Sequence, residues 1–173
     1  MHDAELRQYF ARMRQGEREA FTEVYRDLSR PVYTVILRIV GRREQAEDIA
    51  QELFVKLFQS PLEDTIKSPR AWIFRMAHNM AIDAMRTQHT VQSVEGDECV
   101  PAENEITQAN VRLDVARAML HLSQAEREVV SLHIYGELGF AEIARTMGIS
   151  LSAVWRIWRR ALNRMREELG GHI

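Results

Sequence analysis

Hydrophobic positions recur with the period of an α-helix along nearly the whole chain, and no stretch alternates as a β-strand does. The spacing predicts a short first helix near residues 6–13 and a second helix that ends before Pro31. A third helix is expected over residues 32–40. The clearest stripe predicts an amphipathic helix over residues 44–58, with its apolar face at Ala46, Ile49, Ala50, Leu53 and Leu57.

Two segments lack this periodicity and divide the chain. Residues 60–67 suit a loop, after which Ser68 and Pro69 fit the N-cap and the first position of a helix that reaches about Arg86. Residues 88–105 are polar and acidic, without long apolar runs, and are expected to link two domains. Because helical spacing returns after this segment, the sequence predicts an all-α protein made of two small helical domains.

The pattern near the C-terminus is that of a helix-turn-helix. A short amphipathic helix over residues 140–147 precedes Gly148, a residue suited to the left-handed backbone of a helix end. Ser150 then fits the N-cap of a second helix that runs to about Arg166. This helix carries no acid and has arginines at positions 156, 159, 160, 164 and 166. Such a helix suits phosphate contacts and guanine readout in a major groove, although a helical hairpin with a solvated basic face has the same pattern.

Charge is distributed unevenly, which matters because the net charge of −2 argues at first against a nucleic-acid partner. Residues 1–87 hold 14 basic residues (Lys or Arg) and 13 acidic residues (Asp or Glu). Residues 88–110 hold no basic and five acidic residues, and residues 111–173 hold nine basic and seven acidic residues. An acidic segment therefore masks two mildly basic ones, and DNA stays a candidate partner.

Other chemistry finds little support in the residues. The single cysteine, Cys99, excludes an internal disulfide, and no Cys or His cluster has metal-ligand spacing. His78 is interpreted as a surface or capping histidine. No nucleophile, base and acid occur as a set, so neither enzymatic activity nor a cofactor is expected. Because a signal-peptide pattern and an apolar run of about 20 residues are both missing, we expect a cytoplasmic protein without membrane insertion.

Residues 122–169 resemble region 4 of bacterial sigma factors. The pattern is that of the extracytoplasmic-function (ECF) group, and the matching residues are Leu122, Arg127, Glu128, Val129, Gly139, Glu142, Ile143, Ala144, Gly148, Ile149, Ser150 and Val154. LuxR-type regulators end in a similar helix-turn-helix, so this half alone does not separate the two classes.

Residues 44–58 and 68–87 resemble region 2 of the same group. The matching residues are Ala46, Glu47, Asp48, Gln51, Glu52, Phe54, Pro69, Arg70, Ala71, Trp72, Arg75, Ala77, Asn79, Ala81 and Asp83. With the region 4 match, the resemblance covers almost the whole chain. It implies a region 2 helical bundle over residues 1–87, an acidic linker over residues 88–105 and a region 4 helix-turn-helix domain over residues 106–173.

The resemblance implies a sigma factor, which binds core RNA polymerase, directs it to promoters and assists their opening. Docking on the β flap tip is implied for the C-terminal domain, and binding to the β′ clamp helices for Asp48, Gln51, Glu52, Phe54 and Val55. The implied contacts with the −10 element are Trp72, Arg75, Asn79 and Arg86. Those with the −35 element are Ser150, Ser152, Ala153, Trp155, Arg156, Arg159 and Arg160. Whether an anti-sigma factor also binds is left open.

The second helix of the helix-turn-helix departs from the family pattern. Relatives usually carry Thr-Val-Lys/Arg-Ser-Arg at positions that match residues 153–157, where Trp155 and Ile157 stand in this chain. We expect Trp158 to pack within the domain and Trp155 to be partly exposed, in contact with a thymine methyl or with a protein. The alternative function is a helix-turn-helix regulator that binds an operator without joining core polymerase, against which the motif over residues 48–54 argues.

Overall fold

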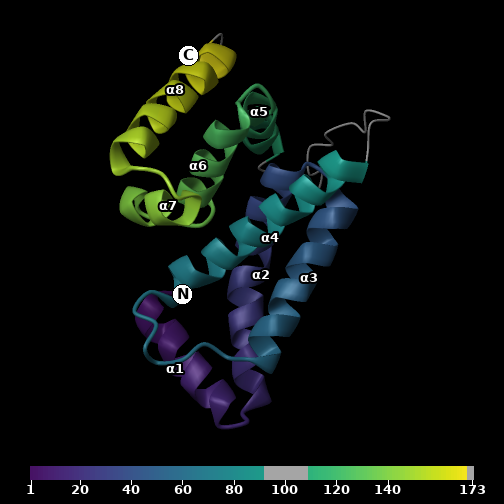
Figure 1. Ribbon diagram of the computed structural model, residues 1–173, viewed down its shortest axis with the longest axis vertical. Coiled ribbons are helices and arrows are strands. Elements are labelled where there is room, and N and C mark those ends of the chain that lie inside the picture. The colour runs from purple at the N-terminus through teal and green to yellow at the C-terminus, as the bar shows by residue number, and fades with distance from the viewer. Residues whose placement is uncertain (92–108, 171–173) are drawn as a thin grey trace.

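The structure is a computed structural model that describes residues 1–91 and 109–170, and these residues form eight α-helices without a strand (Figure 1). Four helices make up the N-terminal bundle: α1 (Asp3–Arg14), α2 (Arg18–Val40), α3 (Arg43–Gln59) and α4 (Pro69–Val91). Four more make up the C-terminal bundle: α5 (Ala109–Leu120), α6 (Gln124–Ile134), α7 (Phe140–Met147) and α8 (Leu151–Leu169). The predicted all-α fold is confirmed.

The segment between the two bundles begins later than the sequence suggests. Helix α4 continues to Val91, so the expected boundary after residue 87 falls within this helix. Helix α5 begins at Ala109. The part of the expected linker over residues 92–105, with Cys99, lies outside the described residues.

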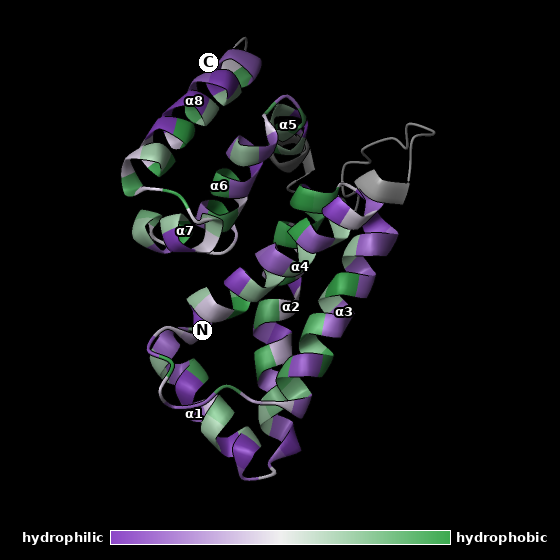
Figure 2. Ribbon diagram, viewed as in Figure 1, coloured by the Kyte–Doolittle hydropathy of each residue, from purple (hydrophilic) through white to green (hydrophobic). Residues whose placement is uncertain are grey.

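Helix α2 is the centre of the N-terminal bundle and packs against α1, α3 and α4 (Figure 1). The apolar stripe predicted for residues 44–58 is buried on α3 along its whole length. Figure 2 shows hydrophilic and hydrophobic residues mixed along each helix, as expected for helices that each cover part of a common core. The large side chains that are fully buried in this bundle include Leu6, Phe10, Leu28, Ile36, Leu53, Leu57, Ile73 and Phe74.

The expectation of a helix end before Pro31 is wrong, because α2 runs through this proline without interruption. An interior proline destabilises a helix by about 3 kcal/mol, since it lacks an N–H and crowds the preceding turn. Leu28 and Val32 flank it and are fully buried, and burying one such side chain stabilises by about 1.5–3 kcal/mol. Continuous burial on both sides therefore outweighs the local preference. The helix ends at Gly41, which has a φ of 74° and donates its N–H to the carbonyl of Leu37.

Helix α4 begins at Pro69 with Ser68 in the N-cap position, as the sequence predicts, but the side chain that caps the helix comes from α1. The carboxylate of Asp3, on α1, accepts a hydrogen bond from the backbone N–H of Arg70 at 2.9 Å. The hydroxyl of Ser68 has a single proton to donate and lies within hydrogen-bond distance of two carboxylates, 3.0 Å from Asp3 and 3.2 Å from Glu142. The capping carboxylate thus comes from a part of the chain that sequence spacing does not connect with α4.

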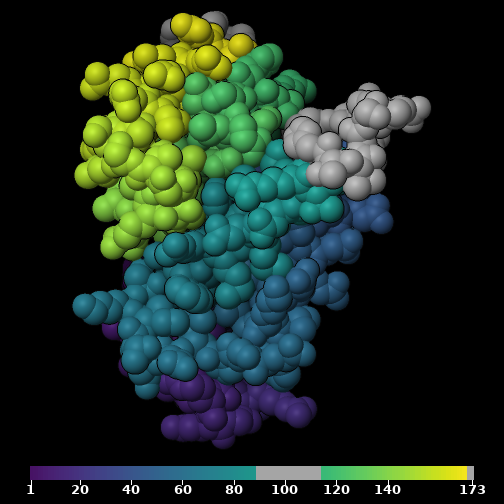
Figure 3. All heavy atoms as spheres, in the orientation of Figure 1, coloured from purple at the N-terminus to yellow at the C-terminus, as the bar shows by residue number. Residues whose placement is uncertain are grey.

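The two bundles pack directly on each other. Figure 3 shows the green and yellow-green atoms of the C-terminal bundle against the teal atoms of the N-terminal bundle without a visible gap, and α7 packs against α4. Helix α6 also packs against α2. Val129 and Leu132 of α6 are fully buried and join the same hydrophobic core as the side chains of α2 and α4. In this conformation the bundles therefore share one continuous core.

Candidate functional site

Helices α7 and α8 form the predicted helix-turn-helix. Gly148 ends α7 in the left-handed conformation, with a φ of 68°. Ser150 is the N-cap of α8, and its hydroxyl accepts a hydrogen bond from the backbone N–H of Ala153 at 3.1 Å. Val154 and Ala161 fix the inner face of α8 because both are fully buried. The turn and the cap predicted from the sequence are confirmed.

The outer face of α8 presents an uncompensated positive charge. Arg156, Arg159 and Arg160 are exposed and form no ion pair with any residue that the structure describes. Arg164 differs from them, because its guanidinium lies 3.4 Å from the buried carboxylate of Glu126 and so turns toward its own bundle. Free guanidinium groups on one helix face are the groups that contact phosphates and guanine edges in DNA.

The remaining residues of the predicted −35 set divide by exposure. Ser152 is exposed on the arginine side of α8, whereas Ala153 is half-buried. Ser150 is exposed, but its hydroxyl is engaged in capping the helix. This end of α8 therefore offers Ser152 and the arginines as its free polar groups.

An aromatic cluster joins α7 to α8. Phe140 is its centre, with ring centroids 4.5 Å from Trp155 and 5.5 Å from Trp158. His133 of α6 lies 4.8 Å from both Phe140 and Trp158 and makes a 2.9 Å hydrogen bond with the carbonyl of Leu138. Trp158 packs inward as predicted, while Trp155 stays 53% exposed. Trp155 is therefore held by Phe140 and still faces solvent.

A second candidate surface lies on α3. Asp48, Gln51, Glu52 and Val55 are exposed on one face of this helix, as the spacing predicts. Glu52 pairs with Lys56 at 3.1 Å, one turn further along the helix. Beyond Val55 the face continues with exposed aromatic rings, those of Phe58 and, from α2, of Tyr25. The surface is therefore acidic at one end and apolar at the other.

Phe54 does not belong to this exposed face. Its side chain is 4% exposed, and its ring packs edge-to-face on Tyr25 with centroids 5.0 Å apart. The sequence grouped Phe54 with the binding residues because it belongs to the same motif. In the structure it supports the exposed ring of Tyr25 and offers no surface of its own.

A third candidate surface lies on α4. Trp72, Arg75, Asn79 and Arg86 are exposed on one face, and the opposite face buries Ile73, Phe74, Ala77 and Ala81. Helices α6 and α7 approach α4 from that buried side. The Trp72 face therefore stays open to solvent while the two bundles are in contact.

A buried polar contact joins the two bundles, and sequence reasoning missed it. His78 of α4 lies 2.9 Å from the carboxylate of Glu128 on α6, and both side chains are buried. Since a carboxylate only accepts hydrogen bonds, His78 donates from Nε2. Gln124 donates to the other carboxylate oxygen at 2.9 Å. The expected surface or capping histidine is therefore wrong, and the signal against it was present: His78 shares a helix face with Phe74 and Ala81.

The second part of this junction surrounds Arg70. Its Nε donates to the carbonyl of Gly136 at 2.8 Å, its guanidinium lies 3.5 Å from Glu137 and it also covers the ring of Phe74. A side chain at Gly136 would bring its Cβ within 2.6 Å of the carbonyl of Leu132 and 3.3 Å of the Phe74 ring. The turn after α6 thus requires glycine so that the C-terminal bundle can approach α4.

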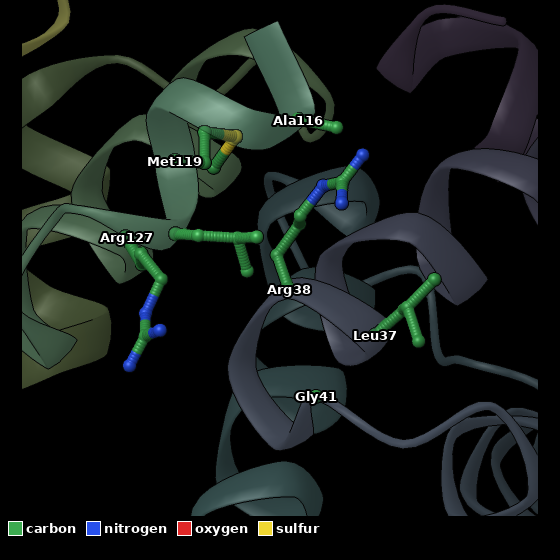
Figure 4. Close-up of a pocket in the computed structure, with 7 residues that line it drawn as sticks. Leu37, Arg38, Gly41, Ala116, Met119 and Arg127 are labelled. Atoms are coloured by element: carbon green, nitrogen blue, oxygen red, sulfur yellow. The ribbon is translucent and has the colours of Figure 1, made fainter. Parts of the chain in front are cut away.

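A small cavity of about 20 Å³ lies between the end of α2 and helices α5 and α6. It has room for a water molecule but not for a nucleotide or a similar ligand. Arg38 and Arg127 both line it, but Figure 4 shows their side chains extending in opposite directions. They do not form a clamp for an anion.

Nothing in the described residues points to a metal ion or a membrane span. No group of three His, Cys, Asp or Glu side chains lies close enough together there to hold a metal. Within the same residues, no helix has the length and apolar character needed to cross a bilayer. The surfaces on α3, α4 and α8 therefore remain the candidates for function.

Models of two protein regions match the chain in order along the sequence. Sigma-70 region 2 matches residues 24–90, and sigma-70 region 4 matches residues 118–167. The ECF RNA polymerase sigma factor SigL of Mycobacterium tuberculosis is 31% identical over 159 residues, which cover 85% of this chain and 89% of SigL. The ECF RNA polymerase sigma factor SigK of Mycobacterium ulcerans is 27% identical over 162 residues, 87% of this chain and 86% of SigK.

Two solved structures share the fold. CnrH, solved in complex with the cytosolic domain of CnrY, has a TM-score of 0.69 at 20% identity over 98% of this chain and 99% of CnrH. The sigma factor RpoE from Bartonella quintana, solved with the anti-sigma factor NepR, has a TM-score of 0.69 at 20% identity over 88% of this chain and 98% of RpoE. At these identities the likeness concerns the arrangement of the helices.

Proposed function

Because the chain belongs to the ECF group of the sigma-70 family and is a sigma factor that directs core RNA polymerase to promoters, we propose that three surfaces divide this work. The α3 face binds core polymerase, the α4 face contacts the −10 element and the α8 face contacts the −35 element. The observation that carries the proposal is that all three faces are exposed on separate helices while the buried faces of the same helices hold the fold together.

The α3 face suits a protein partner better than DNA. Asp48 and Glu52 would repel phosphates, whereas they complement a basic helical partner such as the β′ clamp helices. The apolar end at Val55 and Phe58 adds the type of surface that is buried in the centre of protein interfaces.

The α4 and α8 faces suit DNA, each in its own way. The exposed ring of Trp72, one turn before Arg75 on the same face, offers an unstacked base a surface on which to rest, as promoter opening at the −10 element requires. The arginine face of α8 suits duplex DNA at the −35 element. We place the contact with the β flap tip on the C-terminal bundle as well.

Reading both elements together requires the bundles to separate. At about 3.4 Å per base pair, elements about 25 base pairs apart lie about 85 Å from each other along the duplex. A compact chain of 173 residues has a radius of gyration of about 16 Å, so the closed molecule is too short. We propose that the closed conformation is the state of the protein off polymerase.

Other partners and the site of action follow from this role. An anti-sigma factor is a further partner that we propose, in line with the complex of the similarly folded RpoE. The reaction itself belongs to core polymerase, so the chain acts as a transcription initiation factor without catalytic residues of its own. Its place of action is the cytoplasm, where polymerase and promoter DNA are found.

Transcription in vitro with core RNA polymerase and a promoter library tests the proposed function. We expect initiation from a defined pair of −35 and −10 elements only when both the chain and core polymerase are present. The alternative regulator would instead bind duplex DNA tightly by itself and support no initiation with core polymerase. That outcome would overturn the proposal.

A single arginine substitution tests the assignment of the α8 face. We expect Arg160→Ala to weaken binding to the −35 element by about 1–3 kcal/mol, the range for a bidentate contact with a base. The loss should be confined to one base position, measured as holoenzyme affinity for point variants of the selected −35 duplex. Arg166→Ala is the matched control, because Arg166 is exposed at the opposite end of α8 from the predicted −35 contacts. An equal loss on every duplex, with a smaller salt dependence, would mean a phosphate contact.

A further inference from the structure

Trp155, the exposed member of the aromatic cluster on α8, has no specific role in the proposed function. Leu151 and Trp155 lie one turn apart, 47% and 53% exposed, and form an apolar shoulder at the N-terminal end of the helix. The neighbouring exposed side chains are those of Ser152 and Arg156. Exposing an apolar pair to water is unfavourable in free energy, so such a pair beside an arginine face indicates a site that a partner covers.

The ring of Trp155 is held in place before any partner arrives. It meets the ring of Phe140 at an interplanar angle of 69°, with centroids 4.5 Å apart, in the edge-to-face geometry that aromatic pairs favour. Phe140 is fixed in turn by His133 and Trp158. A side chain that is already ordered loses little conformational entropy when it makes a contact.

Charge restricts what that partner is. From Leu151 to Arg166 the helix has five arginines and no acid, so a partner that covers the shoulder and the adjoining face must be anionic. Duplex DNA meets both demands, since the N-terminal part of a reading helix approaches base edges in the major groove. The one apolar group that a base pair presents there is the methyl group of thymine.

We propose that Leu151 and Trp155 read a thymine in the −35 duplex through its 5-methyl group. This assignment rests on the proposed function, because it requires that α8 lies in the major groove at the −35 element. It makes Trp155 a specificity-determining residue, whereas the arginines supply charge and guanine contacts. Phe140 is a positioning residue, which acts by orienting the Trp155 ring.

The test removes the methyl group and leaves the rest of the duplex unchanged. Holoenzyme made from core polymerase and the full chain selects −35 sequences from a randomised duplex library. The selected duplex is then prepared with deoxyuridine in place of each thymine in turn. We expect one replacement to lower holoenzyme affinity about fourfold, the factor that corresponds to burial of one methyl group.

Two variants decide whether Trp155 is responsible. In W155A the thymine and deoxyuridine duplexes should bind equally well, which also shows that the variant still folds and binds DNA. In R159A both affinities should fall while their ratio stays at the wild-type value. Methyl discrimination that survives in W155A overturns the assignment.

The failures of the two proposals differ in appearance. If the library yields no enriched sequence with holoenzyme, the proposed function of α8 itself is wrong. If a sequence is enriched but no thymine replacement changes its affinity, only the methyl contact is wrong. The exposed ring of Trp155 would then be assigned to a protein partner.

Discussion

Replacing His78 with leucine should open the molecule. The substitution leaves the buried carboxylate of Glu128 with only its hydrogen bond from Gln124, and a buried polar group that loses a partner destabilises by about 1–3 kcal/mol, or more where it is charged. Because Glu128 regains water when the bundles separate, this penalty falls on the closed conformation. We expect a larger radius of gyration by small-angle X-ray scattering, with the helical circular dichroism retained.

Two further variants keep this prediction distinct from general loss of stability. Adding Glu128→Leu to His78→Leu should close the molecule again, because replacing both partners of a buried polar contact by apolar groups can be nearly neutral for stability. His121→Ala is the control, since His121 is exposed and its contact with Glu168 at 3.7 Å is also exposed. An unchanged radius of gyration in the single variant would contradict the role given to this contact.

The same variant links the junction to polymerase binding. If the closed conformation must open on core polymerase, part of the binding free energy is used to separate the bundles. His78→Leu removes part of that requirement, so its affinity for core polymerase should rise above that of the wild type. A competition assay against the wild-type chain measures this directly.

Much of the fold was predictable because local rules and burial agree over most of the chain. The stripe on α3, the N-cap at Ser150 and the turn at Gly148 each depend on residues within one or two helical turns. Pro31 is where they disagree, and there burial on both sides of the proline prevailed over its local preference.

The contact between the bundles was not predictable, because it joins residues far apart in sequence. The polar and acidic composition of residues 88–105 predicted a linker, but it contained no information on whether the two domains contact each other. His78 was misread since a histidine is compatible with both surface and core, and only its place on the Phe74 and Ala81 face favoured the core. The roles of Arg70 and Gly136 depend on where the turn after α6 lies, which helical periodicity does not determine.

The candidate surfaces were predictable as faces of helices, but not in every member. Helical spacing places Asp48, Gln51, Glu52 and Val55 together, and they are exposed together. Phe54 was included for its motif, not for its angular position, and it is buried against Tyr25. Phe54→Ala is therefore a poor test of polymerase binding, since a buried phenylalanine changed to alanine costs about 3–5 kcal/mol of stability.

Reversing the charge of the α3 face should abolish polymerase binding without unfolding the chain. Asp48→Lys combined with Glu52→Lys places two cations where we propose that a basic partner docks, and like charges across an interface cost several kcal/mol. We expect the affinity for core polymerase to fall at least about 100-fold, since 1.4 kcal/mol corresponds to a factor of about ten. Both side chains are exposed, and the lost pair of Glu52 with Lys56 is worth only about 0.3–0.5 kcal/mol.

The control for this double variant changes the net charge equally at a distance from α3. Glu5→Lys with Glu167→Lys reverses two exposed acids, on α1 and α8. If binding depended only on overall charge, both double variants would weaken it to the same extent. If the α3 face is the docking site, the control should bind core polymerase with nearly the wild-type affinity. Equal loss in the two variants would therefore remove the assignment of Asp48 and Glu52, and it would leave the −10 and −35 surfaces unaffected because they lie on other helices.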